Sequence, residues 1–177
     1  MRRMGYIIAK IRSKLHRKKE YQIVCNYFRR RGAHIGDGCI ICSNLDLCEE
    51  QLLTIGEKTI ISSEVSFITH DVSISLASGQ IGSLFGRITI GSNCFIGKRS
   101  TIMYGVTIGN NNIVGAGSVV TKSFKEDGVI IAGNPAKVIG KTRAFSEKYG
   151  DRVLTMNELF KIVNESDDLL TKKLIIK

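Results

Sequence analysis

One histidine, His70, stands where the regular pattern of the chain breaks, in the stretch FITHDVSI at residues 67–74. A neutral imidazole can take a proton from a hydroxyl group at working pH, because the ordinary pKa of histidine lies close to neutrality. Asp71 and Glu50 carry carboxylates that could hold the second ring nitrogen or bind a substrate. The alternative is a half-exposed polar side chain at a strand end, and the residue types alone leave both interpretations open.

The elements that would position His70 follow a repeat of six residues. This period fits neither a helix, with about 3.6 residues per turn, nor the alternation of a long strand. Each hexapeptide instead predicts a short strand that turns its aliphatic residue inward, then a corner that favours glycine or asparagine. Three such strands form one triangular coil, and stacked coils share parallel hydrogen bonds, so the sequence predicts a mainly β protein, a parallel β-helix. The repeated positions are Ile35, Ile41, Leu47, Ile55, Ile61, Phe67, Ile90, Ile96, Ile102, Ile108, Val114 and Val120.

Two insertions interrupt the repeat, a short one after the first three hexapeptides and a long one at residues 71–88. If the long insertion loops out and the chain returns in register, His70 lies at the corner after the third strand of its coil. The same edge then carries Glu50 one coil below, Gly105 one coil above and Lys122 two coils above, about 10 Å away along the axis. Such an edge suits a long ligand with reactive chemistry at one end and a phosphate at the other.

The charge of the chain is concentrated at one end. The 177 residues have a formal net charge of +10, and residues 1–31 carry eleven Lys or Arg side chains against one acid, Glu20. Such a segment is either a solvated helix face or a contact with anionic lipid, and nucleic acid is disfavoured because no recognition motif accompanies the charge. Apolar runs are too short for a membrane span, and the start of the sequence is a poor signal peptide. We therefore expect a cytoplasmic protein, and the alternative is a peripheral position at the inner face of the membrane.

Helical spacing flanks the repeat on both sides. We expect a basic helical segment at residues 1–32, the β-helix at 33–141 and a helical C-terminal segment at 142–177. Cys39 and Cys42 form a C-x-x-C pair, but no second pair follows at a spacing that suits zinc, so no metal site is predicted. The inward small-residue positions of the repeat instead give cysteines such as Cys39 a role in packing, with reduced thiols.

Residues 86–140, with the motifs VGAGSVVTK and AGNPAKVIG, resemble the hexapeptide-repeat acetyltransferases. The chain is similar to the branch that contains galactoside, maltose, serine and capsular-sugar O-acetyltransferases, over about residues 33–141. This resemblance implies a left-handed β-helix and a homotrimer with active sites between the subunits. It also implies acetyl-CoA as the acyl donor, with no metal.

The resemblance further implies roles for individual residues. His70 matches the catalytic histidine that precedes an extended loop, and Glu50 matches a carboxylate near the acceptor, with Asp71 as a second candidate there. Phe95 and Tyr104 stand where many members of the family have Trp and Pro, which leaves the acceptor open. The positions that match the CoA site are Lys98, Gly105, Ala116, Thr121, Lys122 and Lys137.

The implied reaction is direct transfer of an acetyl group from acetyl-CoA to a hydroxyl of a sugar or polysaccharide precursor, with His70 as the general base. N-acetylation of an amino sugar, O-acetylation of serine and a non-catalytic trimeric scaffold docked on a membrane are the alternatives. The metal-dependent carbonic anhydrase type shares the repeat but needs three histidine ligands, and it is rejected because His16 lies in the basic helical segment. The few charges in the loop at residues 71–88 favour a neutral glycan as the acceptor.

Overall fold

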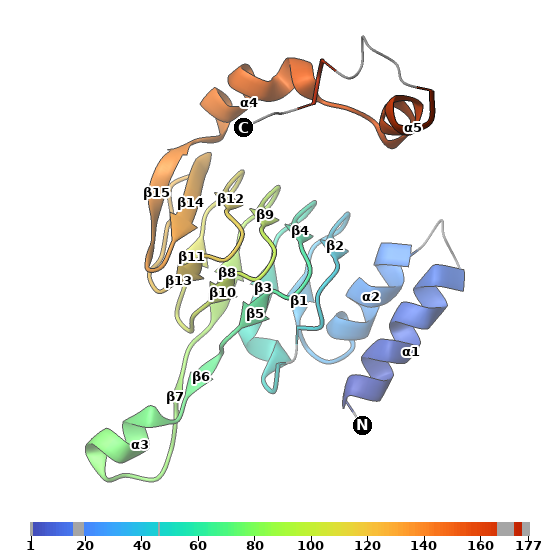
Figure 1. Cartoon of the computed structure of the whole chain (residues 1–177). Helices are drawn as coiled ribbons and strands as arrows, with labels where there is room; N and C mark the ends of the chain where they lie inside the picture. Colours follow the sequence, from blue (N-terminus) through green and yellow to red (C-terminus); the bar gives the residue numbers. More distant parts are fainter. Residues whose placement is uncertain (1, 16–19, 46, 166–171, 175–177) are drawn as a thin grey trace. The chain divides into compact units, whose positions relative to one another are not determined.

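A computed structural model of the protein describes residues 2–15, 20–45, 47–165 and 172–174. The chain divides into two compact units, Met1–Gly140 and Lys141–Lys177. The first unit begins with helices α1 (Arg2–Leu15) and α2 (Glu20–Arg29) and continues into stacked short strands (Figure 1).

Among the described residues, these strands form three faces of a β-helix. The first face contains β1 (His34–Ile35), β3 (Leu53–Ile55), β8 (Ile88–Ile90) and β11 (Thr107–Ile108). The second contains β2 (Ile40–Ile41), β4 (Ile60–Ile61), β9 (Phe95–Ile96), β12 (Ile113–Val114) and β14 (Val129–Gly133), with β15 (Ala136–Lys141) at its edge. The third contains β5 (Ser66–Phe67), β10 (Thr101–Ile102) and β13 (Val119–Val120).

The strands pair in the register that the six-residue period predicts. On the first face, Ile55 lies opposite Ile35 of the coil before it and opposite Ile90 of the coil after it. The long insertion separates Ile55 from Ile90 in the sequence. On the third face, Phe67 lies opposite Ile102. The insertion therefore leaves the coil and returns in register, which confirms the predicted stacking.

The inward positions of the repeat form a continuous apolar core. Ile61, Ile96 and Val114 stack along the second face and are fully buried. Full burial of one such side chain stabilises a fold by about 1.5–3 kcal/mol, so the aliphatic ladder is the main source of stability. Small polar residues between the ladders are also buried, and the hydroxyl of Ser100 donates to the carbonyl of Gly115 in the next coil at 3.0 Å.

Asparagine serves the corner between the first and second faces. Asn93 and Asn111 occupy the left-handed region, with φ of 55° and 57°. Asparagine tolerates this conformation better than most residues with a side chain. The Asn93 side-chain amide donates to the Asn111 side-chain oxygen of the next coil at 2.8 Å. The predicted preference of the corners for glycine and asparagine is confirmed at these positions.

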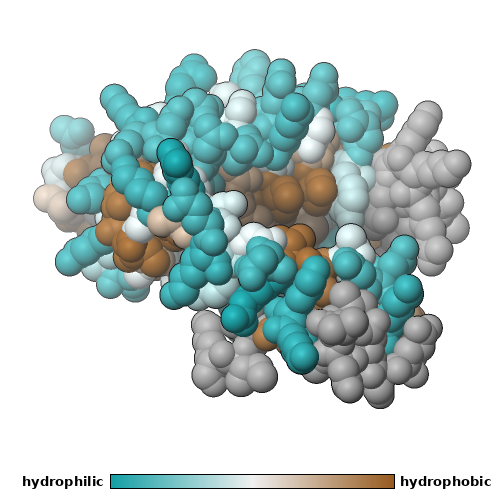
Figure 2. All heavy atoms as spheres, turned by 90° about the horizontal axis from the view of Figure 1, so that it is seen from above, coloured by the Kyte–Doolittle hydropathy of each residue, from teal (hydrophilic) through white to brown (hydrophobic). Residues whose placement is uncertain are grey.

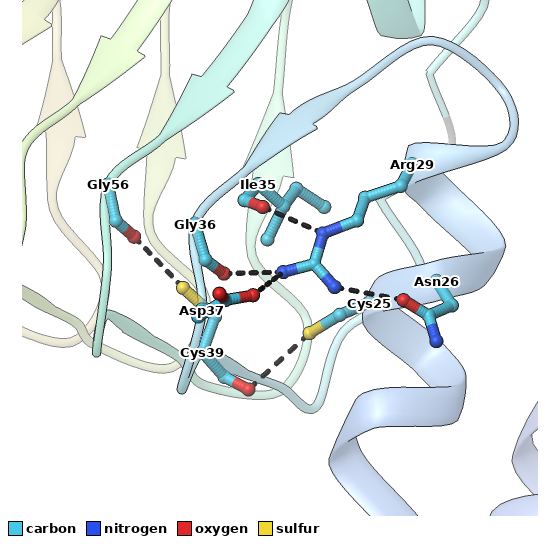
Figure 3. A network of polar contacts seen from close by, with 8 residues as sticks. All are labelled: Cys25, Asn26, Arg29, Ile35, Gly36, Asp37, Cys39 and Gly56. Carbon is cyan, nitrogen blue, oxygen red and sulfur yellow. Dashed lines mark hydrogen bonds and ion pairs between the residues drawn. The ribbon is translucent and has the colours of Figure 1, made fainter.

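Helix α2 is fastened to the first coil by a polar network (Figure 3). The Arg29 guanidinium donates to the carbonyls of Ile35 and Gly36, both at 2.7 Å. The Cys25 thiol donates to the carbonyl of Cys39 at 3.4 Å, and burial raises the pKa of the Cys25 thiol to about 11. Cys39 is itself 2% exposed, so it packs inward as predicted.

The long insertion projects from the third face as a hairpin that carries a short helix (Figure 1). It consists of β6 (His70–Asp71), α3 (Ser73–Ser78) and β7 (Leu84–Phe85), and β6 and β7 pair antiparallel. We refer to residues 71–88 as the insertion loop.

The second unit contains helices α4 (Thr142–Tyr149) and α5 (Met156–Glu165), joined by a short helical turn at Gly150–Arg152. The predicted helical spacing from residue 142 onward agrees with these helices, although residues 166–171 and 175–177 lie outside the described part of the chain. No helix within the described ranges has the length and hydropathy needed to cross a membrane.

Candidate active site

His70 directly precedes the insertion loop and meets a carboxylate that the sequence analysis did not consider. The Nδ1 atom of His70 lies 3.1 Å from Oε2 of Glu49, and the hydroxyl of Thr69 donates to the same oxygen at 2.6 Å. A carboxylate only accepts, so this contact places the hydrogen of the neutral ring on Nδ1. Nε2 is then the ring atom able to accept a proton. The His70 side chain is 42% exposed, which leaves the ring open to a ligand.

Glu50, one residue further on, is engaged elsewhere. It is 5% exposed, and its Oε1 accepts from Nε and Nη2 of Arg31, both at 2.6 Å. A helical turn at Glu50–Leu52 begins within the short insertion, directly after Glu49. The sequence analysis named Glu50 and Asp71 as candidates either to hold the ring of His70 or to bind the acceptor, and the carboxylate that contacts the ring in the structure is that of Glu49.

Asp71 fastens the insertion loop rather than the imidazole. Its carboxylate accepts from the backbone N–H of Ser73 at 2.8 Å and from the hydroxyl of Tyr104 at 3.2 Å. The hydrogen bonds from Ser73, and to a smaller extent that from Tyr104, hold the pKa of Asp71 below its usual range. Tyr104, noted above as a departure from the family pattern, thus ties the third coil to the loop that follows His70.

Backbone packs closely beside His70 at the predicted edge. Gly86 donates its N–H to the carbonyl of Thr69 at 3.0 Å, and a Cβ at Gly86 would lie 2.5 Å from the backbone nitrogen of Gly105. Gly86 therefore carries the returning chain between the histidine and the next coil. Gly105 has φ of 75°, and, apart from its chain neighbours, no described residue lies within 4 Å of the position of its absent Cβ, so the space on this side of its Cα is open.

The apolar neighbour of His70 is Phe85, which faces it across the hairpin. Their ring centroids lie 5.8 Å apart with the planes inclined at 43°. Phe85 is 60% exposed and Leu84 44%, so the entrance to the histidine is partly apolar. Figure 2 shows a different face, seen from above, on which brown apolar atoms also reach the surface among teal polar ones.

The residues matched to the CoA site lie along two different edges. Lys98 and Ala116 follow the second face, and the N–H of Gly117 donates to the carbonyl of Lys98 at 2.8 Å, so their coils stack directly. Thr121 and Lys122 follow the third face, on the same side as His70. The structure thus groups His70, Gly105, Thr121 and Lys122 on one edge, and separates Lys98 and Ala116 from them by one face of the β-helix.

The lysines of these edges have individual environments. Lys98 forms an ion pair with Glu64 at 3.1 Å, and hydrogen bonds from Arg99 and then from Lys98 keep the pKa of Glu64 below its usual range. Lys122 is exposed and its ammonium lies 5.7 Å from the ring centroid of Phe124. Lys137 is exposed on β15.

Neither of two hollows near helix α1 includes His70. The larger, of about 540 Å³, is lined by residues that include Tyr6, Ser43 and Ser66. The smaller, of about 250 Å³, lies between α1 and α2. Within the described part of the chain, no three His, Cys, Asp or Glu side chains converge as ligands for a metal ion.

Comparison with known proteins gives matches to the repeat region of the chain. A family model described as the hexapeptide repeat of succinyl-transferase matches residues 87–122. Protein CapG of Staphylococcus aureus is 44% identical over 125 residues, which cover 68% of this chain and 72% of that protein. Galactoside O-acetyltransferase of Escherichia coli (strain K12) is 39% identical over 109 residues, covering 60% of this chain and 52% of the relative, so the chain spans about half the length of that protein.

A solved structure shares the fold. A hexapeptide-repeat acetyltransferase from Vibrio cholerae, complexed with acetyl coenzyme A, superposes with a TM-score of 0.55 at 20% identity, over 80% of this chain and 87% of that one. The β-helix is therefore of the left-handed kind that the family resemblance implied. The chain belongs to the hexapeptide-repeat acetyltransferase family.

The sequence analysis missed Glu49, Thr69 and Gly86. A signal for Gly86 was present, because a glycine just before the return to register indicates a close approach of backbone. For Glu49 the signal was ambiguous, because two adjacent glutamates fall within an insertion that shifts the period.

Proposed function

We propose that this protein is an acetyl-CoA-dependent O-acetyltransferase that acts on a hydroxyl of a sugar or polysaccharide precursor, with His70 as the general base. The observation that carries the proposal is the contact of His70 Nδ1 with Glu49, which leaves Nε2 as the proton acceptor at the edge that also carries Gly105. The similarity to a galactoside O-acetyltransferase and to a structure complexed with acetyl coenzyme A supports the donor and the acceptor class.

The chemistry follows from the orientation of the ring. Nε2 of His70 takes the proton of the acceptor hydroxyl as that oxygen attacks the thioester carbonyl carbon of acetyl-CoA. The new C–O bond yields a tetrahedral oxyanion, for which backbone N–H groups of the neighbouring coil near Gly105 would serve as donors. Collapse of this intermediate breaks the C–S bond, and the imidazolium returns its proton to the CoA thiolate. The Glu49 carboxylate stabilises the imidazolium that forms during the reaction.

The two edges point to a shared site. Residues matched to the CoA site occur on both edges, and in one chain a face of the β-helix lies between them. A trimer in which one edge of a subunit faces the other edge of its neighbour would bring Lys98 and Ala116 of one copy to His70 of another. Lys122 and Lys137 would neutralise CoA phosphates in this arrangement.

The acceptor would enter beside the insertion loop. Phe85 and Leu84 offer exposed apolar surface next to His70, and sugars present apolar C–H faces as well as hydroxyls. The carboxylate of Asp71, which lies closest to His70 in the loop, is already engaged by Ser73 and Tyr104. These features favour a neutral glycan over a charged amino acid.

Release of the CoA thiol from acetyl-CoA, measured against a panel of sugars, nucleotide sugars, amino sugars and serine, tests the proposal. We expect turnover with a sugar hydroxyl, and a loss of about 10²–10⁴-fold in kcat for His70→Ala with the binding of CoA retained. His34→Ala, at an exposed position of β1, is the matched control and should retain activity. Near-wild-type turnover of His70→Ala would refute the assignment of His70 as the general base. Turnover with serine alone, or with an amino group alone, would refute the assignment of a sugar hydroxyl as the acceptor.

A further inference from the structure

Helix α1 presents an apolar face to solvent. Ile7, Ile8 and Ile11 are 52%, 50% and 55% exposed. The opposite face of the helix, with Tyr6 and Ala9 each 7% exposed, packs against the rest of the first unit. The helix is therefore apolar on two sides, and the fold uses only one of them.

The exposed isoleucines form one stripe. Positions 7 and 11 are four residues apart and positions 8 and 11 are three apart, so their side chains emerge on the same side of a helix. The sequence continues this spacing with a methionine at position 4 and a leucine at position 15. In Figure 1 α1 is the outermost element at its end of the first unit, beyond α2. Contiguous apolar surface of this kind marks an interaction site.

Basic residues are frequent in the sequence of the α1 segment. The α1 segment, residues 2–15, contains five Lys or Arg residues and no acid. The net charge of residues 1–31 equals that of the whole chain, so the β-helix and the C-terminal unit together are neutral. Any long-range attraction to a negatively charged surface is therefore centred on the two N-terminal helices.

The neighbouring hollow has a matching character. It lies between α1 and α2, has a volume of about 250 Å³, and is lined by apolar side chains that include Ile8 and Ile23. Arg30 and Arg31 contribute to the same wall, and Arg30 is exposed. Apolar surface beside exposed positive charge is the combination that an interfacial helix offers to a lipid headgroup and its acyl chain.

We propose that the outer face of α1 docks on a membrane surface that contains anionic lipids. In this arrangement the helix lies in the plane of the interface, with Ile7, Ile8 and Ile11 at the boundary between headgroups and acyl chains, and the net positive charge of residues 1–31 is attracted to the lipid phosphates. The apolar stripe and the positive charge of the segment are both used.

The charge of the helix favours a membrane surface over a second copy of the chain, and its apolar stripe favours a membrane surface over a nucleic acid. A second copy of the chain would bring one basic α1 against another and would be opposed by repulsion between like charges. A nucleic acid would accept the positive charge but would leave three isoleucines in water. Only a surface that is both anionic and apolar matches both features of the helix.

Co-sedimentation of the full chain with lipid vesicles tests the proposal. We expect binding to vesicles of phosphatidylcholine mixed with phosphatidylglycerol, weak binding to phosphatidylcholine alone, and a loss of binding as salt shortens the screening length from about 10 Å at 0.1 M to about 3 Å at 1 M. The variant Ile7→Ser/Ile11→Ser should lower the partition coefficient by about tenfold or more, which corresponds to ~1.4 kcal/mol. Isoleucine and serine have similar helix propensities, so this exchange preserves the helix.

The matched control removes equal apolar exposure elsewhere. Val153 and Met156 are 69% and 70% exposed in the C-terminal unit, and Val153→Ser/Met156→Ser should bind vesicles as the wild type does. Equal partitioning of the α1 variant and the wild type would overturn the proposal, and so would equal binding to the two kinds of vesicle. A change in self-association without lipid, together with unchanged vesicle binding, would assign the stripe to contacts between copies. None of these measurements depends on acetyl transfer, so they stand apart from the proposed function.

Discussion

Replacement of Glu49 by alanine tests whether this carboxylate positions the ring of His70. One oxygen of Glu49 accepts from the Thr69 hydroxyl at 2.6 Å and lies 3.1 Å from Nδ1 of His70. Thr69 is buried, so the carboxylate is anchored on one side while it contacts the ring on the other. Without Glu49 the ring can rotate and change tautomer, and Nε2 is no longer fixed as the proton acceptor.

The size of the effect follows from the exposure of the pair. A hydrogen bond to a charged group contributes about 1.5–3 kcal/mol when it is well shielded. The side chains of His70 and Glu49 are 42% and 21% exposed, so water weakens the contact and about 1–2 kcal/mol is the appropriate range. This predicts a loss of about 5- to 30-fold in kcat for Glu49→Ala, with the KM for acetyl-CoA unchanged. Glu49→Gln keeps an accepting oxygen and should fall between this variant and the wild type.

The assay is steady-state release of the CoA thiol, with thermal unfolding of each variant measured in parallel. Glu57→Ala, at an exposed corner of the second coil, is the matched control and should leave kcat within about twofold of the wild type. A Thr69→Val background should reduce the further loss caused by Glu49→Ala, because the two residues form one hydrogen-bonded unit. If kcat of Glu49→Ala stays within about twofold of the wild type while the protein remains folded, the positioning role is refuted.

Two further predictions follow from other contacts. Glu50→Gln should lower the free energy of unfolding, measured in urea, by about 1–3 kcal/mol without a change in kcat, because it removes a charge that is paired with Arg31. A selective rise in the KM for the acceptor would contradict this structural role and would indicate that Glu50 contacts the acceptor. Co-assembly of His70→Ala with Ala116→Trp, each inactive alone, should recover up to about a quarter of the wild-type activity, because two subunits would supply the two edges of one site. If the mixed oligomers recover no activity, the site is not shared between subunits, and both edges belong to a site within one chain.

The scaffold could be predicted from the sequence better than the site, because the scaffold is built from a repeat of six residues and the site is not. Aliphatic residues at intervals of six define which side chains point inward, and a shift of register would expose them, so the opposition of Ile55 to Ile90 could be predicted across a long insertion. The positions of Lys98 and Ala116 could also be predicted, since each lies two residues after an inward residue of the second face. Counting from Ile96 and Val114 places both on a different edge from His70.

The choice between Glu49 and Glu50 had no such support. The short insertion removes the period at that point, and a helical turn at Glu50–Leu52 then sets the directions of the two side chains. Arg31, which pairs with Glu50, comes from the chain just after α2, so the outcome depends on a tertiary contact with the N-terminal segment. The period of the repeat carries no information about the contact between Arg31 and Glu50. Without that contact, the sequence gives no reason to choose Glu49 over Glu50 as the partner of His70.

The same N-terminal segment links the proposed site to the proposed membrane surface. The helices pack on the first coil, His70 leaves from the second, and coils stack at about 4.8 Å, so the histidine lies only one or two coil spacings along the axis from the end that carries the positive charge. A protein docked through α1 would hold its insertion loop close to that surface, which favours an acceptor presented near a membrane. Docking through α1 would in this way determine where acetyl transfer takes place.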